Sequence, residues 1–102
     1  MAAKLNLDKL DLQIIHHMME NAEISYAEGA LDVKTKELLG LVASMVLRCD
    51  DCIKYHLGKS HELGVNTKEM YEVFAVANIV GGTIVVPHTR RAAEYWEALV
   101  EN

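Results

Sequence analysis

The stretch from Val33 to Arg48 restricts the possible folds of this chain more than any other segment. Its sequence, VKTKELLGLVASMVLR, places apolar side chains around most of a helix instead of along one stripe. Such a helix has to be covered by other helices, so this segment is predicted to be central and buried. One narrow stripe differs, because it carries Glu37, Gly40, Ser44 and Arg48. We expect its two small residues, Gly40 and Ser44, to let another helix approach closely.

The N-terminal segment shows the periodicity of a second helix. It is predicted over about residues 8 to 22, with Asn6 as the N-cap. Its apolar stripe consists of Leu7, Leu10, Ile14 and Met18. A looser segment follows, in which Gly29 is the stop signal.

The second half of the chain contains the signals of three more helices. The first of these holds both cysteines and ends at Gly64, a predicted left-handed cap. Asn66 and Glu69 form a capping-box pattern that opens the next helix, which is expected to run to about residue 80. The last helix is predicted to begin near Pro87. Its inward-facing residues are expected to be Ala92, Ala93, Trp96, Leu99 and Val100.

Length and composition fit one helical domain that associates with further copies of itself. The chain has 102 residues, of which 51% are hydrophobic and only 6% aromatic. Two halves of this length would each be too small for a core, so we expect a single all-α domain of about five helices over residues 1–102. The apolar excess is hard to bury in a monomer, which predicts a homo-oligomer.

The charge pattern argues against nucleic acid and membranes as partners. The net charge is −5, and the densest basic patch is the short run TRRA. The first residues are too acidic for a signal peptide, and the longest mostly apolar stretch is well short of the ~20 residues of a membrane span. We therefore expect a cytoplasmic protein. Cysteines are normally reduced there, so a pair of them points to catalysis or metal binding.

The segment RCDDCIKYH contains the only two cysteines, Cys49 and Cys52. On a helix their Cα atoms would lie about 5 Å apart, within the range of a disulfide. His56 follows on the same helical face. A free thiol has a pKa of about 8.5 and reacts as the thiolate, which Asp50 and Asp51 disfavour by their negative charge. The dithiol would therefore depend on His56 as a base.

Residue spacing alone leaves other interpretations open. A structural zinc site usually has four protein ligands, so His56 would need a distant partner such as His61 or His88. Covalent haem attachment would need a histidine directly after the second cysteine, where Ile53 stands instead. The cysteines could also be incidental residues of a helix.

A longer pattern favours the dithiol. Glu37, Cys49, Cys52 and His56 form the run E-x11-C-x2-C-x3-H, which resembles the signature of the AhpD-like alkylhydroperoxidases, a branch of the carboxymuconolactone decarboxylase family. The similarity extends from GALDVKTKELLG to VFAVANIVGG, over half of the chain. It implies an all-helical subunit that assembles into hexamers, our first expectation, or trimers.

The resemblance also implies a role for each of the four residues. Cys52 would be the peroxidatic cysteine that attacks a hydroperoxide, and Cys49 the resolving cysteine. His56 would accept the proton from Cys52, and Glu37 would orient His56. No cofactor or metal is implied, and an external dithiol, such as a lipoyl or thioredoxin-like partner, would reduce the disulfide. The alternatives are a lactone decarboxylase-like lyase and a redox-sensing adaptor.

Helix geometry predicts an axial offset between Glu37 and His56. In a simple hairpin that turns near Arg48, Glu37 and His56 would be offset by about three residues, or roughly 4.5 Å along the axis.

The other histidines are weaker candidates: His16 and His17 are expected on a polar or interface side, and His61 on an outer side. Two further expectations concern packing. The core should include Met18, Met19, Met45 and Met70, and subunit contacts should include Tyr95 and Trp96.

Overall fold

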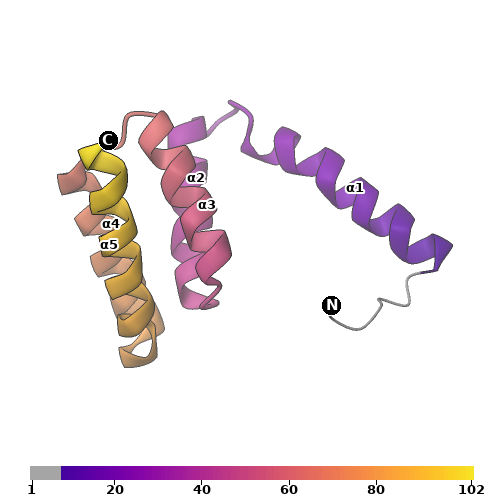
Figure 1. Cartoon of the computed structure of the whole chain (residues 1–102). Helices are drawn as coiled ribbons and strands as arrows, with labels where there is room; N and C mark the ends of the chain where they lie inside the picture. Colours follow the sequence, from indigo (N-terminus) through magenta and orange to yellow (C-terminus); the bar gives the residue numbers. More distant parts are fainter. Residues whose placement is uncertain (1–7) are drawn as a thin grey trace.

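The computed structural model describes residues 8–102, and these form five α-helices and one short 3₁₀ helix. The helices are α1 (Lys9–Tyr26), α2 (Val33–Val46), α3 (Asp50–Glu62), α4 (Thr67–Gly81), η1 (Thr83–Val85) and α5 (Val86–Glu101). Helices α2 to α5 pack side by side as a bundle, and α1 projects away from it (Figure 1). The prediction of an all-α fold is confirmed, since no strand occurs between residues 8 and 102.

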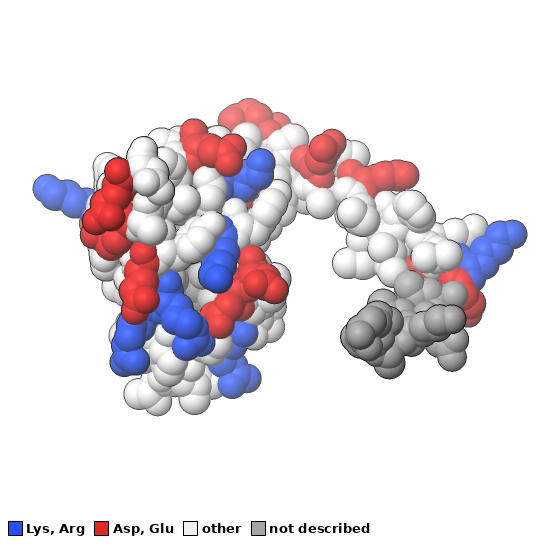
Figure 2. Space-filling view, viewed as in Figure 1, with Lys and Arg blue, Asp and Glu red and all other residues white. Residues whose placement is uncertain are grey.

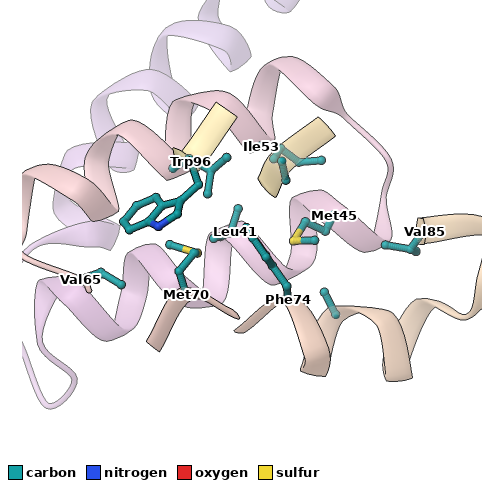
Figure 3. Packing of buried hydrophobic residues seen from close by; sticks show 11 residues of the cluster. Leu41, Met45, Ile53, Val65, Met70, Phe74, Val85 and Trp96 are labelled. Carbon is teal, nitrogen blue, oxygen red and sulfur yellow. The ribbon is translucent and has the colours of Figure 1, made fainter. Parts of the chain in front are cut away.

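Helix α2 is central, as its apolar pattern predicts, and contacts both α3 and α4. Leu41 and Met45 of α2 are fully buried, and residues from α3, α4 and α5 surround them (Figure 3). Each large apolar side chain that is buried in this way stabilises the fold by about 1.5–3 kcal/mol. The core consists of Leu41, Met45, Ile53, Leu57, Val65, Met70, Phe74, Ala77, Val85, Ala92 and Trp96.

Trp96 corrects one expectation about subunit contacts. Its side chain is fully buried among the core residues of this chain, and its Nε1 donates a hydrogen bond to Thr67 Oγ1 at 3.1 Å. A buried indole needs such a partner for its N–H group. Tyr95 is half-buried, and Nζ of Lys54 lies over its ring, 5.7 Å from the ring centroid.

The N-terminal helix differs from its prediction in length and in burial. It continues to Tyr26, and Asp8 caps it in a reciprocal capping box with Asp11. Asn6 and Leu7 lie outside the described residues. No residue of α1 is buried, so Met18 and Met19 are exposed and not core residues as predicted. The physical reason is that α1 projects from the bundle, so its apolar stripe is not covered by the described residues (Figure 1).

The helix ends in the second half follow the sequence signals closely. Gly64 has a φ of 86°, and Asn66 and Glu69 form both hydrogen bonds of the capping box. The segment TIVV, which could be extended in isolation, forms η1 and the first residue of α5. Val100 is exposed instead of inward-facing, because it lies in the last turn of α5 at the end of the bundle.

None of the helices within residues 8–102 is long and apolar enough to cross a membrane.

Candidate redox site

The two cysteines lie at the start of α3, directly after the tight connection from α2. Helix α2 ends at Val46, and Arg48 adopts a left-handed backbone conformation with a φ of 60°. Cys49 is extended (φ −102°, ψ 96°) and is the N-cap of α3. The connection thereby places the sulfur of Cys49 at the positive end of the α3 dipole.

Cys49 and Cys52 form a disulfide, with their Cα atoms 5.3 Å apart. The expected spacing of about 5 Å is therefore observed. The backbone N–H of Cys52 donates to Cys49 Sγ at 3.3 Å, which is the capping interaction of the helix. Cys52 is exposed, whereas Cys49 is half-buried. Taken as whole residues, Cys52 is thus the more accessible of the two cysteines.

Glu37 of α2 and His56 of α3 form a buried pair. His56 Nδ1 lies 2.7 Å from Glu37 Oε1, and the two residues are only 9% and 5% exposed. A carboxylate can only accept a hydrogen bond, so the neutral imidazole donates from Nδ1. His56 Nε2 is then left as the proton acceptor. The axial offset expected for a simple hairpin does not separate the two groups, since they lie within hydrogen-bond distance.

Gly40 explains how the imidazole fits against α2. A Cβ atom on Gly40 would lie 2.9 Å from His56 Cε1, closer than real Cβ contacts allow, and 3.1 Å from His56 Nε2. It would also lie 2.5 Å from the hydroxyl oxygen of Tyr26. The predicted close approach at Gly40 is therefore confirmed. The groups that approach Gly40 are the side chains of His56 and Tyr26.

Two tyrosines, neither of them predicted from the sequence to belong to the site, lie beside the imidazole. The Tyr55 ring stands edge-on to His56 at a centroid distance of 5.3 Å, and the Tyr26 ring lies at 5.7 Å. Burial raises the pKa of Tyr26, and the nearby Glu37 carboxylate and Tyr55 add to this effect. Tyr26 is therefore a neutral phenol at pH 7. Tyr55 is adjacent to His56 in sequence, whereas no sequence signal links Tyr26 to it.

A pocket of about 530 Å³ opens beside Glu37, between the end of α1 and the helices α2 and α3. Tyr26, Tyr55 and Lys59 are among the residues that line it, together with Glu37 itself. The carboxylate end of the pair therefore adjoins a space that solvent can enter.

The other histidines lie apart from the Glu37–His56 pair. His16 and His17 are exposed on α1, and His61 is exposed, with its ring edge-on to Trp96 at 5.7 Å. His88, at the start of α5, bonds instead to Asp50 between the two cysteines. Throughout residues 8–102, no group of three or more His, Cys, Asp or Glu residues could hold a metal ion.

Sequence comparison agrees with this architecture. The profile of the carboxymuconolactone decarboxylase family matches residues 13–95, which include all four residues of the candidate site. The chain therefore belongs to the carboxymuconolactone decarboxylase family.

Two solved structures of the same family resemble this chain. A Thermotoga maritima protein, which has been suggested to take part in an antioxidative response, is 46% identical with a TM-score of 0.81. That match covers 93% of this chain and 95% of the other. A Legionella pneumophila protein in its apo form is 26% identical with a TM-score of 0.79, over 89% of this chain and 81% of the other.

Two curated relatives are more distant. An uncharacterized protein of the cox locus of Paracoccus denitrificans is 27% identical over 71 residues, or 70% of this chain. An uncharacterized protein of Cupriavidus necator is 26% identical over 72 residues, or 71% of this chain. Each match spans 64% of the relative's own length.

Proposed function

We propose that this protein is a thiol-dependent peroxidase and disulfide oxidoreductase of the AhpD-like type. The observation that carries the proposal is the position of the Cys49–Cys52 disulfide, one helical turn before a buried Glu37–His56 pair. A base that is already oriented by a carboxylate, next to a vicinal dithiol, is the arrangement that activates a thiol nucleophile.

In the oxidative half of the cycle, the Cys52 thiolate attacks one oxygen of the hydroperoxide. An S–O bond forms, the O–O bond breaks, and the other oxygen leaves as an alkoxide that is protonated to the alcohol. Cys52 becomes a sulfenic acid. The Cys49 sulfur then attacks the Cys52 sulfur, the S–O bond breaks, and water leaves. The peroxide has gained two electrons, and the dithiol has lost two in forming the disulfide.

The Glu37–His56 pair supplies the proton transfers of this half. His56 Nε2 removes the thiol proton from Cys52, directly or through one water, and returns it to the leaving alkoxide. Glu37 holds the imidazole by its Nδ1–H group and stabilises the imidazolium ion. Glu37 also lines the pocket beside it, so solvent there can exchange protons with the pair.

Reduction requires a dithiol from outside the chain, which we propose to be a lipoyl group or a thioredoxin-like protein. Its thiolate would attack the sulfur of Cys52, the exposed residue of the pair, and Cys49 would leave as the thiolate. The positive end of α3 and the Cys52 N–H favour the negative charge on Cys49. Because this cycle needs a continuous supply of thiols, the cytoplasm is its proposed location.

The test separates the roles of the two cysteines. Reduced Cys49→Ser protein should consume one equivalent of cumene hydroperoxide and stop as a sulfenic acid, detected by dimedone labelling and mass spectrometry. Reduced Cys52→Ser protein should not react at a comparable rate. The opposite result would overturn the assigned order.

Turnover distinguishes an enzyme from a redox sensor. With dihydrolipoamide in excess, the unmodified protein should consume many equivalents of peroxide. Consumption of a single equivalent with every dithiol tested would contradict the peroxidase and support a redox-sensing adaptor instead.

A further inference from the structure

Two residues in the first half of α5 contact Asp50, which lies between the cysteines. His88 Nδ1 lies 2.9 Å from Asp50 Oδ1, and Arg91 Nε lies 3.2 Å from Asp50 Oδ2. Arg91 Nη2 is also 3.2 Å from Asp50 Oδ2. Each oxygen of this carboxylate therefore has a donor from α5. We call the three residues Asp50, His88 and Arg91 the α5 clamp.

The protons of the clamp can be assigned from its chemistry. The Asp50 carboxylate only accepts hydrogen bonds, so His88 donates from Nδ1 and keeps Nε2 as an acceptor. The Arg91 guanidinium then directs its charge to Asp50. The His88 hydrogen bond is the largest cause of the lowered pKa of Asp50. Burial opposes it, and Arg91 lowers the pKa further through its charge and its hydrogen bond. Asp50 is thus ionised and compensated at pH 7.

Asp50 directly follows Cys49, so its charge acts on that sulfur. A free carboxylate there would oppose the thiolate that forms when the disulfide opens. The clamp brings a guanidinium and an imidazole N–H to the same position. The other charged groups near Cys49 along the chain are Arg48 and Asp51, both exposed, and neither forms an ion pair within the described part of the chain.

We propose that His88 and Arg91 are positioning residues of the redox site, which offset the charge of Asp50 and stabilise the reduced dithiol. The inference rests on the proposed function, because it assumes that Cys49 and Cys52 cycle between dithiol and disulfide. It assigns a role to α5, which carries neither cysteine nor either member of the Glu37–His56 pair. A disulfide whose reduced form is stabilised is more readily reduced by external thiols.

The measurement is the equilibrium constant of the Cys49–Cys52 disulfide against dithiothreitol at pH 7. Arg91→Gln and His88→Ala should each shift it toward the disulfide by about two- to fivefold, the range for partly exposed charge pairs. Arg91→Lys keeps the charge and should stay near the unmodified value. The double variant Asp50→Asn with Arg91→Gln restores the net charge. Its equilibrium constant should therefore lie close to that of the unmodified protein.

Arg90 provides the matched control. It is the neighbouring residue on α5 and has the same charge. It lines a pocket between α4 and α5 and makes no ion pair within the described residues. Arg90→Gln should therefore leave the constant unchanged. Equal shifts from Arg90→Gln and Arg91→Gln, or no restoration in the double variant, would overturn the clamp while leaving the dithiol cycle intact. A disulfide that does not exchange with dithiothreitol at all would overturn both proposals.

Discussion

At the scale of single residues, the Glu37–His56 pair links a central helix to the cysteine helix. Both groups are almost fully buried, so each depends on the other to satisfy its hydrogen bond. Burial of an unpaired carboxylate or imidazole would be costly. The fold therefore holds the imidazole in one orientation before any substrate arrives.

Substitutions in this pair should separate proton transfer from orientation. His56→Ala should slow the reaction of reduced protein with hydroperoxide by roughly 10²-fold or more, the usual scale for loss of a positioned base. Glu37→Gln should slow it less, because the amide oxygen still accepts a hydrogen bond from Nδ1. Stopped-flow measurement of single-turnover rates checks both values. A larger loss in Glu37→Gln than in His56→Ala would contradict the order of roles.

Two glycines in helices offer a controlled comparison. An added Cβ at Gly58 meets nothing within 4 Å, so Gly58→Ala should stabilise the protein by about 0.5–1 kcal/mol through helix propensity. At Gly40 the same methyl group would displace the buried His56 ring. Gly40→Ala should therefore destabilise by about 1–3 kcal/mol, as overpacking does, and slow peroxide reduction. Urea unfolding and rate measurements on both variants test this contrast, which equal effects would disprove.

At the scale of elements, side-chain caps define where the helices begin. Asp32 accepts a hydrogen bond from the Thr35 backbone N–H at 2.7 Å, and Asn66 and Glu69 cap α4 reciprocally. Hydrogen bonds from Thr35 lower the pKa of Asp32 below its ordinary value of 3.8. The ionised carboxylate therefore favours the folded state.

This shift has a defined consequence at low pH. The contribution of Asp32 is present above its unfolded pKa of 3.8 and is lost as the pH falls through its lower folded pKa. Asp32→Asn still caps the helix but does not titrate. Its free energy of unfolding should fall less between pH 5 and pH 2 than that of the unmodified protein. Denaturant unfolding across this pH range measures this free energy for both proteins. An equal fall in the two proteins would contradict the prediction.

At the scale of the whole molecule, two apolar surfaces are exposed within residues 8–102. One lies on α1, whose exposed apolar residues are Leu10, Leu12, Ile14, Ile15, Met18, Met19 and Ile24. The other is on the C-terminal half of α4, where Ala75, Val76, Ile79 and Val80 line a groove of about 250 Å³. Acidic and basic side chains are intermixed over the bundle, and uncharged surface prevails on much of the projecting part (Figure 2).

We expect these surfaces to pair between copies of the chain, in a hexamer first and a trimer second. Exposed apolar area of this extent is typical of an association surface. Ile79, which is 86% exposed, and Met18 are suitable positions for a charge. Ile79→Glu and Met18→Glu should lower the assembly mass in analytical ultracentrifugation, whereas Val100→Glu at the end of α5 should not. A stable monomer of the unmodified chain at micromolar concentration would refute the expectation.

The sequence by itself determined the helices and most of their ends. Periodicity identified the central helix, and Gly64 and the Asn66–Glu69 box located their turns, because these signals depend only on local backbone chemistry. The spacing of Cys49, Cys52 and His56 also follows from helix geometry alone. The four-residue pattern with Glu37 indicated the family that the comparisons confirm.

Only the tertiary structure decided which faces are covered and which distant groups meet. Apolar periodicity is the same whether a helix packs on its own chain or on another. Met18 was therefore wrongly predicted to be a core residue, and Trp96, correctly expected to face inward, was wrongly assigned to subunit contacts. The clamp of Asp50 by His88 and Arg91 joins residues that are 38 and 41 positions apart. Contacts across such separations depend on how α3 and α5 pack, and no local pattern in the sequence records that packing.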